Sequence, residues 1–186
     1  MNYDNFVEKL LLHSCCAPCS THVIEVLKSQ YDVTIFYYNP NIFPKDEFEK
    51  RLAEQKRYAE IVGVPLLTEK YDEGEFLQKV KGLESEKEGG KRCDACFELR
   101  LKKTAEVAKK NGFDIFATTL SVSPYKNSLT INMIGNKVAE GYGIPFLAES
   151  FKKKDGYLDS IRLSKKYDLY RQNYCGCRFS IRKENS

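Results

Sequence analysis

Six of the seven cysteines in this chain of 186 residues occur as three close pairs. The pairs are Cys15-Cys16, with Cys19 close behind in the stretch HSCCAPCSTH, then Cys93-Asp94-Ala95-Cys96, and then Cys175-Gly176-Cys177. Four thiolates can bind a structural zinc ion or an iron–sulfur cluster, and spacing alone does not choose between them. Structural zinc usually holds small modules together, whereas this chain is long enough to bury a core of normal size. We therefore favour an iron–sulfur cluster or another redox metal.

Two alternatives use the same residues differently. Cys16 and Cys19 form a CAPC motif, and Gly63-Val64-Pro65 could supply a proline loop facing it, as in thioredoxin-like thiol-disulfide oxidoreductases. That chemistry leaves the other thiol pairs without a role. The second alternative is a nucleic-acid-binding protein with a structural metal and no redox chemistry.

Short apolar runs and helical patterns alternate along the chain. Strands are expected at Lys9–His13 and in runs that begin at Val33, Val64, Asp114 and Pro145; helices are expected at Ser20–Ser29, Asp46–Val62, Ala95–Lys110 and Ser128–Glu140. This order predicts an α/β fold, a doubly wound and mostly parallel sheet of Rossmann-like type. We expect a single domain over residues 1–186, in which residues 151–186 form a basic C-terminal segment.

The predicted elements place the thiols at the functional edge of such a sheet. Cys15 and Cys16 follow the first strand and precede a helix, where open α/β sheets bind their ligands. Cys93 and Cys96 also open a helix, and a helix N-terminus favours thiolate over thiol. No GxGxxG or P-loop glycine motif occupies a strand–helix turn, so nucleotide binding is not indicated.

The N-terminal sequence and the cysteine content indicate where in the cell the protein is expected. The N-terminal stretch carries acids where a secretory signal is basic, and its apolar run is too short for a membrane span. Cysteines in a reducing compartment point to metal binding or redox catalysis rather than to structural disulfides. We expect a cytoplasmic protein that does not contact membranes.

The C-terminal segment is basic and aromatic. Residues 151–186 hold ten lysines and arginines against four acids, whereas the chain as a whole has a net charge of +4. Such a run is usually only a solvated face. Tyrosines among the cations favour binding of single-stranded nucleic acid instead. The candidate RNA-binding residues are Lys152, Lys153, Lys165, Lys166, Arg171, Tyr170 and Tyr174.

Four motifs in order, HSCCAPCS, RCDACFELRL, TTLSVSPYKN and FKKKDGYLDSIRLSKKYDLYRQNYCGC, resemble those of the cobalamin-independent epoxyqueuosine reductases, the QueH family. The resemblance covers nearly the whole chain. It implies an oxidoreductase that reduces the epoxide of epoxyqueuosine in tRNA to queuosine, the last step of queuosine biosynthesis. It also implies an iron–sulfur cofactor and a sheet similar to that of the adenine-nucleotide α-hydrolase group. The electron donor is not identified by the sequence.

The reaction assigns roles to the cysteine pairs. Because each opens a helix and the two could converge above the sheet, we expect a 4Fe-4S cluster on Cys15, Cys16, Cys93 and Cys96. Asp94 lies between two of these residues and is a candidate to move a proton or to bind a second, mononuclear iron. Cys19 is left over, and packing within the first helix is its expected role.

The Cys175-Gly176-Cys177 motif leaves two functional alternatives open. Its thiols either form a strained, easily reduced disulfide that delivers electrons, or bind the second iron together with Asp94. We expect the neighbouring Arg171 and Arg178 to favour thiolates there. Ser123, Pro124, Tyr125 and Lys126, in the loop after the fourth strand, are further candidates to line the pocket.

Overall fold

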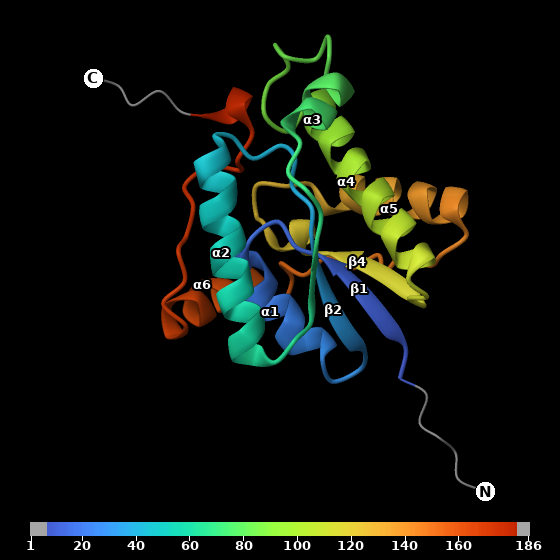
Figure 1. The fold of residues 1–186 in the computed structure, drawn as a ribbon, viewed down its shortest axis with the longest axis vertical. Coiled ribbons are helices and arrows are strands. Elements are labelled where there is room, and N and C mark those ends of the chain that lie inside the picture. Colours follow the sequence, from blue (N-terminus) through green and yellow to red (C-terminus); the bar gives the residue numbers. More distant parts are fainter. Residues whose placement is uncertain (1–6, 182–186) are drawn as a thin grey trace, which may run out of the picture.

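The computed structural model describes residues 7–181 and is built around one sheet (Figure 1). Its strands are β1 (Lys9–His13), β2 (Asp32–Tyr37), β3 (Leu66–Thr68) and β4 (Ile115–Thr118), all parallel and in the order β3-β2-β1-β4. Leu10, Leu11 and Leu12 of β1 are fully buried. A central strand covered on both faces is expected to be continuously apolar in this way.

Helices cover both faces of the sheet. They are α1 (Ala17–Leu27), α2 (Lys45–Val62), α3 (Glu73–Lys79), α4 (Lys91–Lys110), α5 (Ser128–Tyr142) and α6 (Gly156–Lys166). On one face, Leu10 and Leu12 pack with apolar residues of α1 and α2. On the other face, Leu11 packs with residues of α4 and α5. The doubly wound α/β fold predicted from the sequence is confirmed.

The direction of winding reverses beside β1. The chain passes from β1 through α1 to β2 and on to β3, and then returns through α4 to place β4 on the other side of β1. At such a switch point the loops after two neighbouring strands diverge and leave a crevice. The thiols of the β1–α1 turn lie at the carboxyl end of β1, beside this crevice.

Several expected elements differ from the structure. The helix expected from Ser20 begins at Ala17, and the strand expected from Val64 begins at Leu66. The run from Pro145 is not a strand, because only Phe146 forms an isolated parallel bridge, to Phe116. The helix expected from Ala95 begins earlier, at Lys91, so that Cys93 and Cys96 both lie within its first two turns. The short helix α3 and the helix α6 in the C-terminal segment were not predicted.

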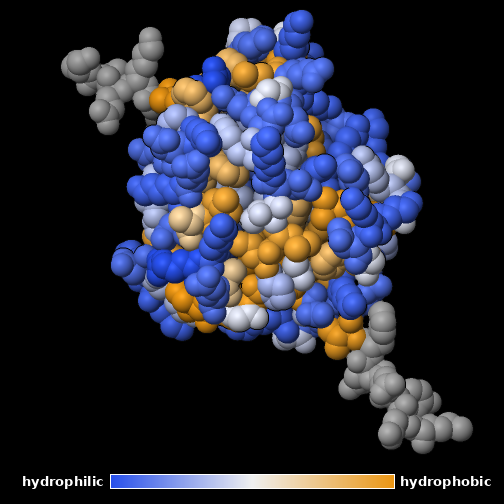
Figure 2. All heavy atoms as spheres, viewed as in Figure 1, coloured by the Kyte–Doolittle hydropathy of each residue, from blue (hydrophilic) through white to orange (hydrophobic). Residues whose placement is uncertain are grey.

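The periphery of the molecule, in the view of Figure 2, is mostly hydrophilic. Figure 2 shows a band of hydrophobic residues across the middle of one face, over the strands. None of the helices within residues 7–181 is long and apolar enough to cross a membrane.

Candidate active site at the ends of strands β1 and β4

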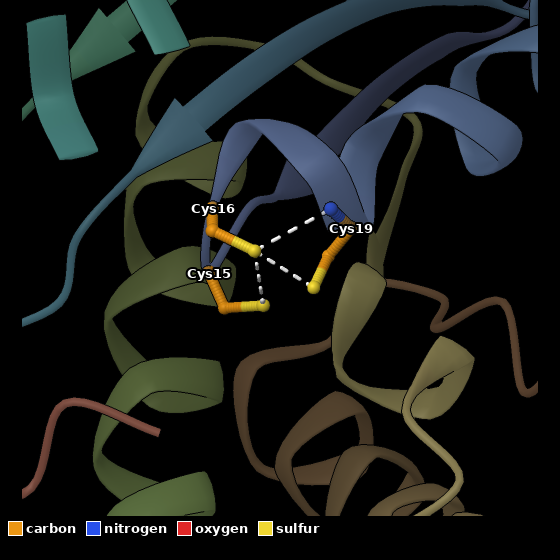
Figure 3. A group of neighbouring side chains, drawn as sticks. All are labelled: Cys15, Cys16 and Cys19. Atoms are coloured by element: carbon orange, nitrogen blue, oxygen red, sulfur yellow. Dashed lines mark hydrogen bonds between the residues drawn. The ribbon is translucent and has the colours of Figure 1, made fainter. Parts of the chain in front are cut away.

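Three thiols converge in the turn between β1 and α1 (Figure 3). The sulfur atoms of Cys15 and Cys16 are 3.9 Å apart and those of Cys16 and Cys19 are 2.7 Å apart. All three sulfurs lie within 4.8 Å of one another. A group of soft donors this compact can bind a thiophilic metal.

The start of α1 creates this convergence. Cys16 is the N-cap residue, and its sulfur accepts a hydrogen bond of 3.4 Å from the backbone N–H of Cys19. Pro18 in the first turn suits a helix start, because the missing N–H needs no partner there. The hydroxyl of Thr119, just after β4, lies 3.2 Å from the backbone nitrogen of Cys15 and 3.4 Å from its sulfur. The turn is therefore anchored to both strands at the switch point.

The thiols of this group differ in acidity. Contacts with the sulfurs of Cys16 and Cys19 hold the pKa of Cys15 well below its ordinary value. Burial instead raises the pKa of Cys16 to about 12. At Cys15 the lowered pKa thus comes from neighbouring side chains, so it does not test the expectation that the helix N-terminus favours thiolate. At Cys16 loss of solvation is the larger effect, and the thiolate is not favoured.

A buried histidine, His13, lies at the end of β1 directly before the thiol turn. His13 is fully buried, with Nδ1 2.9 Å from the hydroxyl of Thr118 and Nε2 3.2 Å from the carbonyl of Tyr38. Since a carbonyl only accepts, Nε2 carries the proton and Nδ1 accepts from Thr118. Burial lowers the pKa of His13 to about 3, so the ring is neutral. His13 therefore links the carboxyl ends of β1, β2 and β4 by hydrogen bonds, and it adds no charge next to the thiols.

The second thiol pair lies at the start of α4. Cys93 accepts a hydrogen bond of 3.2 Å from the backbone N–H of Gly89, and Cys96 is buried. Burial raises the pKa of Cys93, and it raises that of Cys96 to about 11. Here too the thiolate expectation is wrong, because the helix terminus does not offset burial. Burial also raises the pKa of Asp94, which favours its protonated form.

The third pair is held in a loop fixed to α2. Arg51 is buried, is paired with Glu47 at 2.6 Å, and donates hydrogen bonds of 3.3 Å to the carbonyls of Tyr174 and Cys175. The backbone N–H of Phe43 donates a further bond of 2.8 Å to the carbonyl of Gly176. Buried and partnered groups of this kind hold backbone in one conformation. The loop therefore presents its thiols from a fixed position.

Glycine is required between these two cysteines. Gly176 has φ +104°, which side chains rarely adopt, and an added Cβ would lie 2.8 Å from Cγ1 of Ile42. Arg178 forms an ion pair of 2.7 Å with Glu73, so its charge is already balanced. Burial raises the pKa of Cys177. The expectation that nearby arginines favour a thiolate is therefore wrong at Cys177.

Each of the three thiol pairs contributes at least one lining residue to a single cavity of about 660 Å³. Its lining includes the predicted site residues Cys15, Cys93, Asp94, Cys96, Arg171, Tyr174, Cys175 and Cys177, together with Cys19. Cys16 does not line it directly, but its sulfur contacts those of Cys15 and Cys19. Of the candidates in the loop after β4, Ser123, Tyr125 and Lys126 line the cavity and Pro124 does not.

The cavity wall carries more cations than carboxylates. Its cationic residues are Arg51, Arg92, Arg100, Lys126 and Arg171, and its carboxylates are Glu88 and Asp94. The buried guanidinium of Arg100 donates 3.2 Å to Oδ1 of Asn39 and has no carboxylate partner within residues 7–181. Burial lowers the pKa of Lys126, but the sulfurs of Cys15, Cys19 and Cys175 have the opposite effect and the net direction is upward. A wall of this charge favours anionic groups inside the cavity.

The candidate RNA-binding residues lie in different settings. Lys165 and Lys166 are exposed at the end of α6, and Lys153 is exposed before that helix. Lys152 donates 2.8 Å to the carbonyl of Lys126. Arg171 lines the cavity and donates 3.0 Å to the hydroxyl of Ser164. Two cations counted with this segment, Arg182 and Lys183, lie outside the described residues.

The two tyrosines of this set already have partners within the fold. The ring of Tyr170 lies under the ammonium of Lys50, 3.5 Å from the ring centre, and its hydroxyl donates 3.2 Å to Glu47. The ring of Tyr174 lies under Arg51, and its hydroxyl donates to the carbonyl of Phe43. Their observed contacts position the loop before Cys175.

Several residues of the site were not assigned to it from the sequence, and two of them, Cys19 and Gln172, contact the sulfur of Cys16. Cys19 does pack against the core, as expected, but its sulfur also belongs to the thiol group of the turn. Gln172 donates a hydrogen bond of 2.9 Å from Nε2 to the sulfur of Cys16. A helical side chain three residues after an N-cap points back toward it, which is the signal that could have identified Cys19. No local pattern marks Gln172.

Comparison with known proteins identifies the family of this chain. The model of the family described as "Epoxyqueuosine reductase QueH" matches residues 10–183. A relative of that name from Streptococcus pyogenes serotype M1 is 42% identical, over 99% of this chain and 80% of its own. One from Thermotoga maritima is 38% identical, over 92% and 90% respectively.

A solved structure supports the fold. A predicted subunit of a tRNA methyltransferase from Methanocaldococcus jannaschii superimposes with a TM-score of 0.55, over 84% of this chain and 74% of its own. At 14% sequence identity this likeness concerns the fold alone. The family model and the curated relatives, which match almost the whole chain, show more: this chain belongs to the QueH family and is an epoxyqueuosine reductase.

Proposed function

We propose that this enzyme reduces the epoxide of epoxyqueuosine in the anticodon loop of tRNA, with an iron–sulfur cluster held at the cavity. The observation that carries the proposal is the convergence of three thiol pairs on one cavity beside the switch point of the sheet. The donor set fits such a group, since sulfur is the usual ligand of iron–sulfur clusters and N–H donors, from Cys19 and Gln172, point at the sulfur of Cys16.

The proposed 4Fe-4S ligands are Cys15, Cys16, Cys93 and Cys96. A cluster held by these residues would supply electrons one at a time and would offer Lewis-acid chemistry toward the epoxide oxygen. Removing the epoxide oxygen to leave a carbon–carbon double bond consumes two electrons and two protons and releases water. The electrons come from a low-potential donor that remains to be identified.

Residues of the chain supply the protons and the charge. Asp94 lines the cavity between Cys93 and Cys96 in sequence, and this position makes its carboxyl group the candidate to pass a proton to the departing oxygen. The alternative role of Cys175 and Cys177 is to bind metal. In that case Asp94 would bind a second, mononuclear iron together with these two thiols. Lys126 adds a positive charge near the same sulfurs.

The proposed function is tested by a direct assay. Protein prepared without oxygen and reduced with dithionite should convert an anticodon stem-loop carrying epoxyqueuosine to the queuosine form, seen by mass spectrometry as the loss of one oxygen. Metal-free protein should leave the RNA unchanged, because dithiol exchange alone does not remove an epoxide oxygen. Turnover by metal-free protein would contradict the cluster mechanism.

The basic C-terminal segment is proposed to bind the RNA backbone. Replacing Lys165 and Lys166 together with glutamine should weaken binding of the stem-loop and reduce the slope of log K against log salt by about 0.7 to 0.9 for each phosphate that the protein no longer neutralises. The matched control is the same double change at Lys109 and Lys110, an exposed lysine pair that also ends a helix. If the slope is the same in both variants and in the unchanged protein, the segment does not bind phosphate.

A further inference from the structure

The three most exposed large hydrophobic side chains within residues 7–181 lie four residues apart in sequence. They are Tyr125, 83% exposed, Leu129, 73% exposed, and Met133, 70% exposed. Leu129 and Met133 share one face of α5 because residues four apart on a helix are neighbours. Tyr125 stands in the loop that leads into that helix. We call these three residues the apolar ridge.

The fold itself does not use the apolar ridge. The side of α5 that packs against the rest of the protein carries Ile131 and Val138, and Gly135 allows close approach of the Phe146 ring. Isolated exposed hydrophobic residues are common, but an exposed row of large ones usually marks an interaction site. The ridge is therefore a candidate surface for binding a partner.

The ridge begins at the mouth of the thiol cavity. Tyr125 lines that cavity although most of its side chain is exposed, so it stands at the rim. Asn127 and Thr130, at the start of α5, line the cavity as well. The basic C-terminal segment supplies other lining residues, Tyr157 and Arg171. A strand of RNA that enters the cavity would thus lie between a cationic side and an apolar side.

We propose that the apolar ridge binds the anticodon-loop nucleotides that flank the modified base. This inference rests on the proposed function and identifies a second part of the RNA-binding surface. The thiols line a cavity of about 660 Å³, so the modified nucleotide must leave the base stack to reach them. Its neighbours are then deprived of their stacking partners. A tyrosine ring and apolar side chains replace that stacking without reading base identity.

The rim position and the aromatic residue favour RNA as the occupant. Every base presents a flat face that stacks on Tyr125, and the ridge continues directly from the cavity that receives the substrate. Lys126, adjacent in sequence, brings a positive charge to the same rim. A protein electron donor and a second copy of this chain are the competing occupants, and the experiment separates them.

Two variants test the ridge: Tyr125→Ala, and the double change Leu129→Gln with Met133→Gln. All three positions are exposed, so folding should be unchanged, and Ile61→Gln on α2, at an exposed apolar residue away from the cavity lining, is the matched control. The dissociation constant for an epoxyqueuosine stem-loop should rise about fivefold or more in Tyr125→Ala, the effect of removing one stacked base. Tyr125→Phe should restore binding, and Ile61→Gln should bind normally.

Two other outcomes would contradict RNA binding by the apolar ridge and leave the proposed reductase function unaffected. If RNA affinity is unchanged and turnover falls only with a protein electron donor, not with dithionite, the ridge docks that donor. If affinity is unchanged and sedimentation shows that the variants no longer form a dimer, it is a subunit interface. Failure of the unchanged protein to reduce the stem-loop with dithionite would refute the proposed function alone, because the RNA affinities are measured independently of turnover.

Discussion

Cys16→Ser and Cys96→Ser should each remove most of the iron and sulfide from protein prepared without oxygen. The unchanged protein should be brown and contain about four iron and four sulfide, as a single Cys₄ cluster requires. Both sulfurs are buried, so a serine hydroxyl would leave a weaker oxygen donor in a site built for thiolate. Metal and sulfide analysis with the visible spectrum measures the loss.

Cys19→Ser is the sharpest companion variant. Its sulfur lies 2.7 Å from that of Cys16, yet the proposed ligand set uses Cys93 and Cys96 instead. If the set is correct, Cys19→Ser keeps the cluster. Loss of iron in Cys19→Ser with retention in Cys96→Ser would replace the proposed set by the thiols of the β1–α1 turn. A colourless, fully active protein with stoichiometric zinc would contradict the iron–sulfur proposal altogether.

Cys175→Ser or Cys177→Ser should abolish multiple turnover. Both residues line the cavity, and Arg51 and Phe43 fix the loop that carries them, so a serine there changes chemistry with little change of position. The unfolding temperature should remain close to that of the unchanged protein, which serves as the check on folding. Turnover is measured with the epoxyqueuosine stem-loop.

Metal content separates the two roles of this pair. If the thiols form a redox disulfide, the variants keep all their metal and complete one turnover from a chemically reduced cluster. If they bind the second iron with Asp94, the variants lose metal, and Asp94→Asn should show the same deficit. Full metal and full multiple turnover in both serine variants would exclude the pair from the active site.

Much of the fold followed from local pattern. The buried run at Lys9–His13 and the alternation of strands and helices indicated a doubly wound sheet with thiols at its carboxyl edge. The prediction of a strand from Pro145 was wrong. A short apolar segment has the same sequence pattern whether it forms a full strand or, as here, a single isolated bridge. The helix α6 begins at Gly156, and glycine weakens a helical pattern; the side chain of Asp155 before it makes no capping hydrogen bond.

The site was predicted less completely than the fold, for a physical reason. Spacing shows which thiols are close in sequence, but acidity depends on burial, which is a property of the folded chain. The pKa of Cys16 and that of Cys96 are raised for this reason, although Cys16 caps α1 and Cys96 lies in the second turn of α4. Likewise the contact between Gln172 and Cys16 joins residues far apart in sequence, and no local pattern contains it.

The attachment of the Cys175 loop to Arg51 has a consequence for biogenesis. Synthesis releases the chain from its N-terminus, so the thiols of the β1–α1 turn and of α4 are made long before residues 174–176, whose carbonyls bond to Arg51 and Phe43. Until that loop docks, the cavity lacks the wall that carries Cys175 and Cys177. The complete set of thiols around the cavity therefore forms only late in folding.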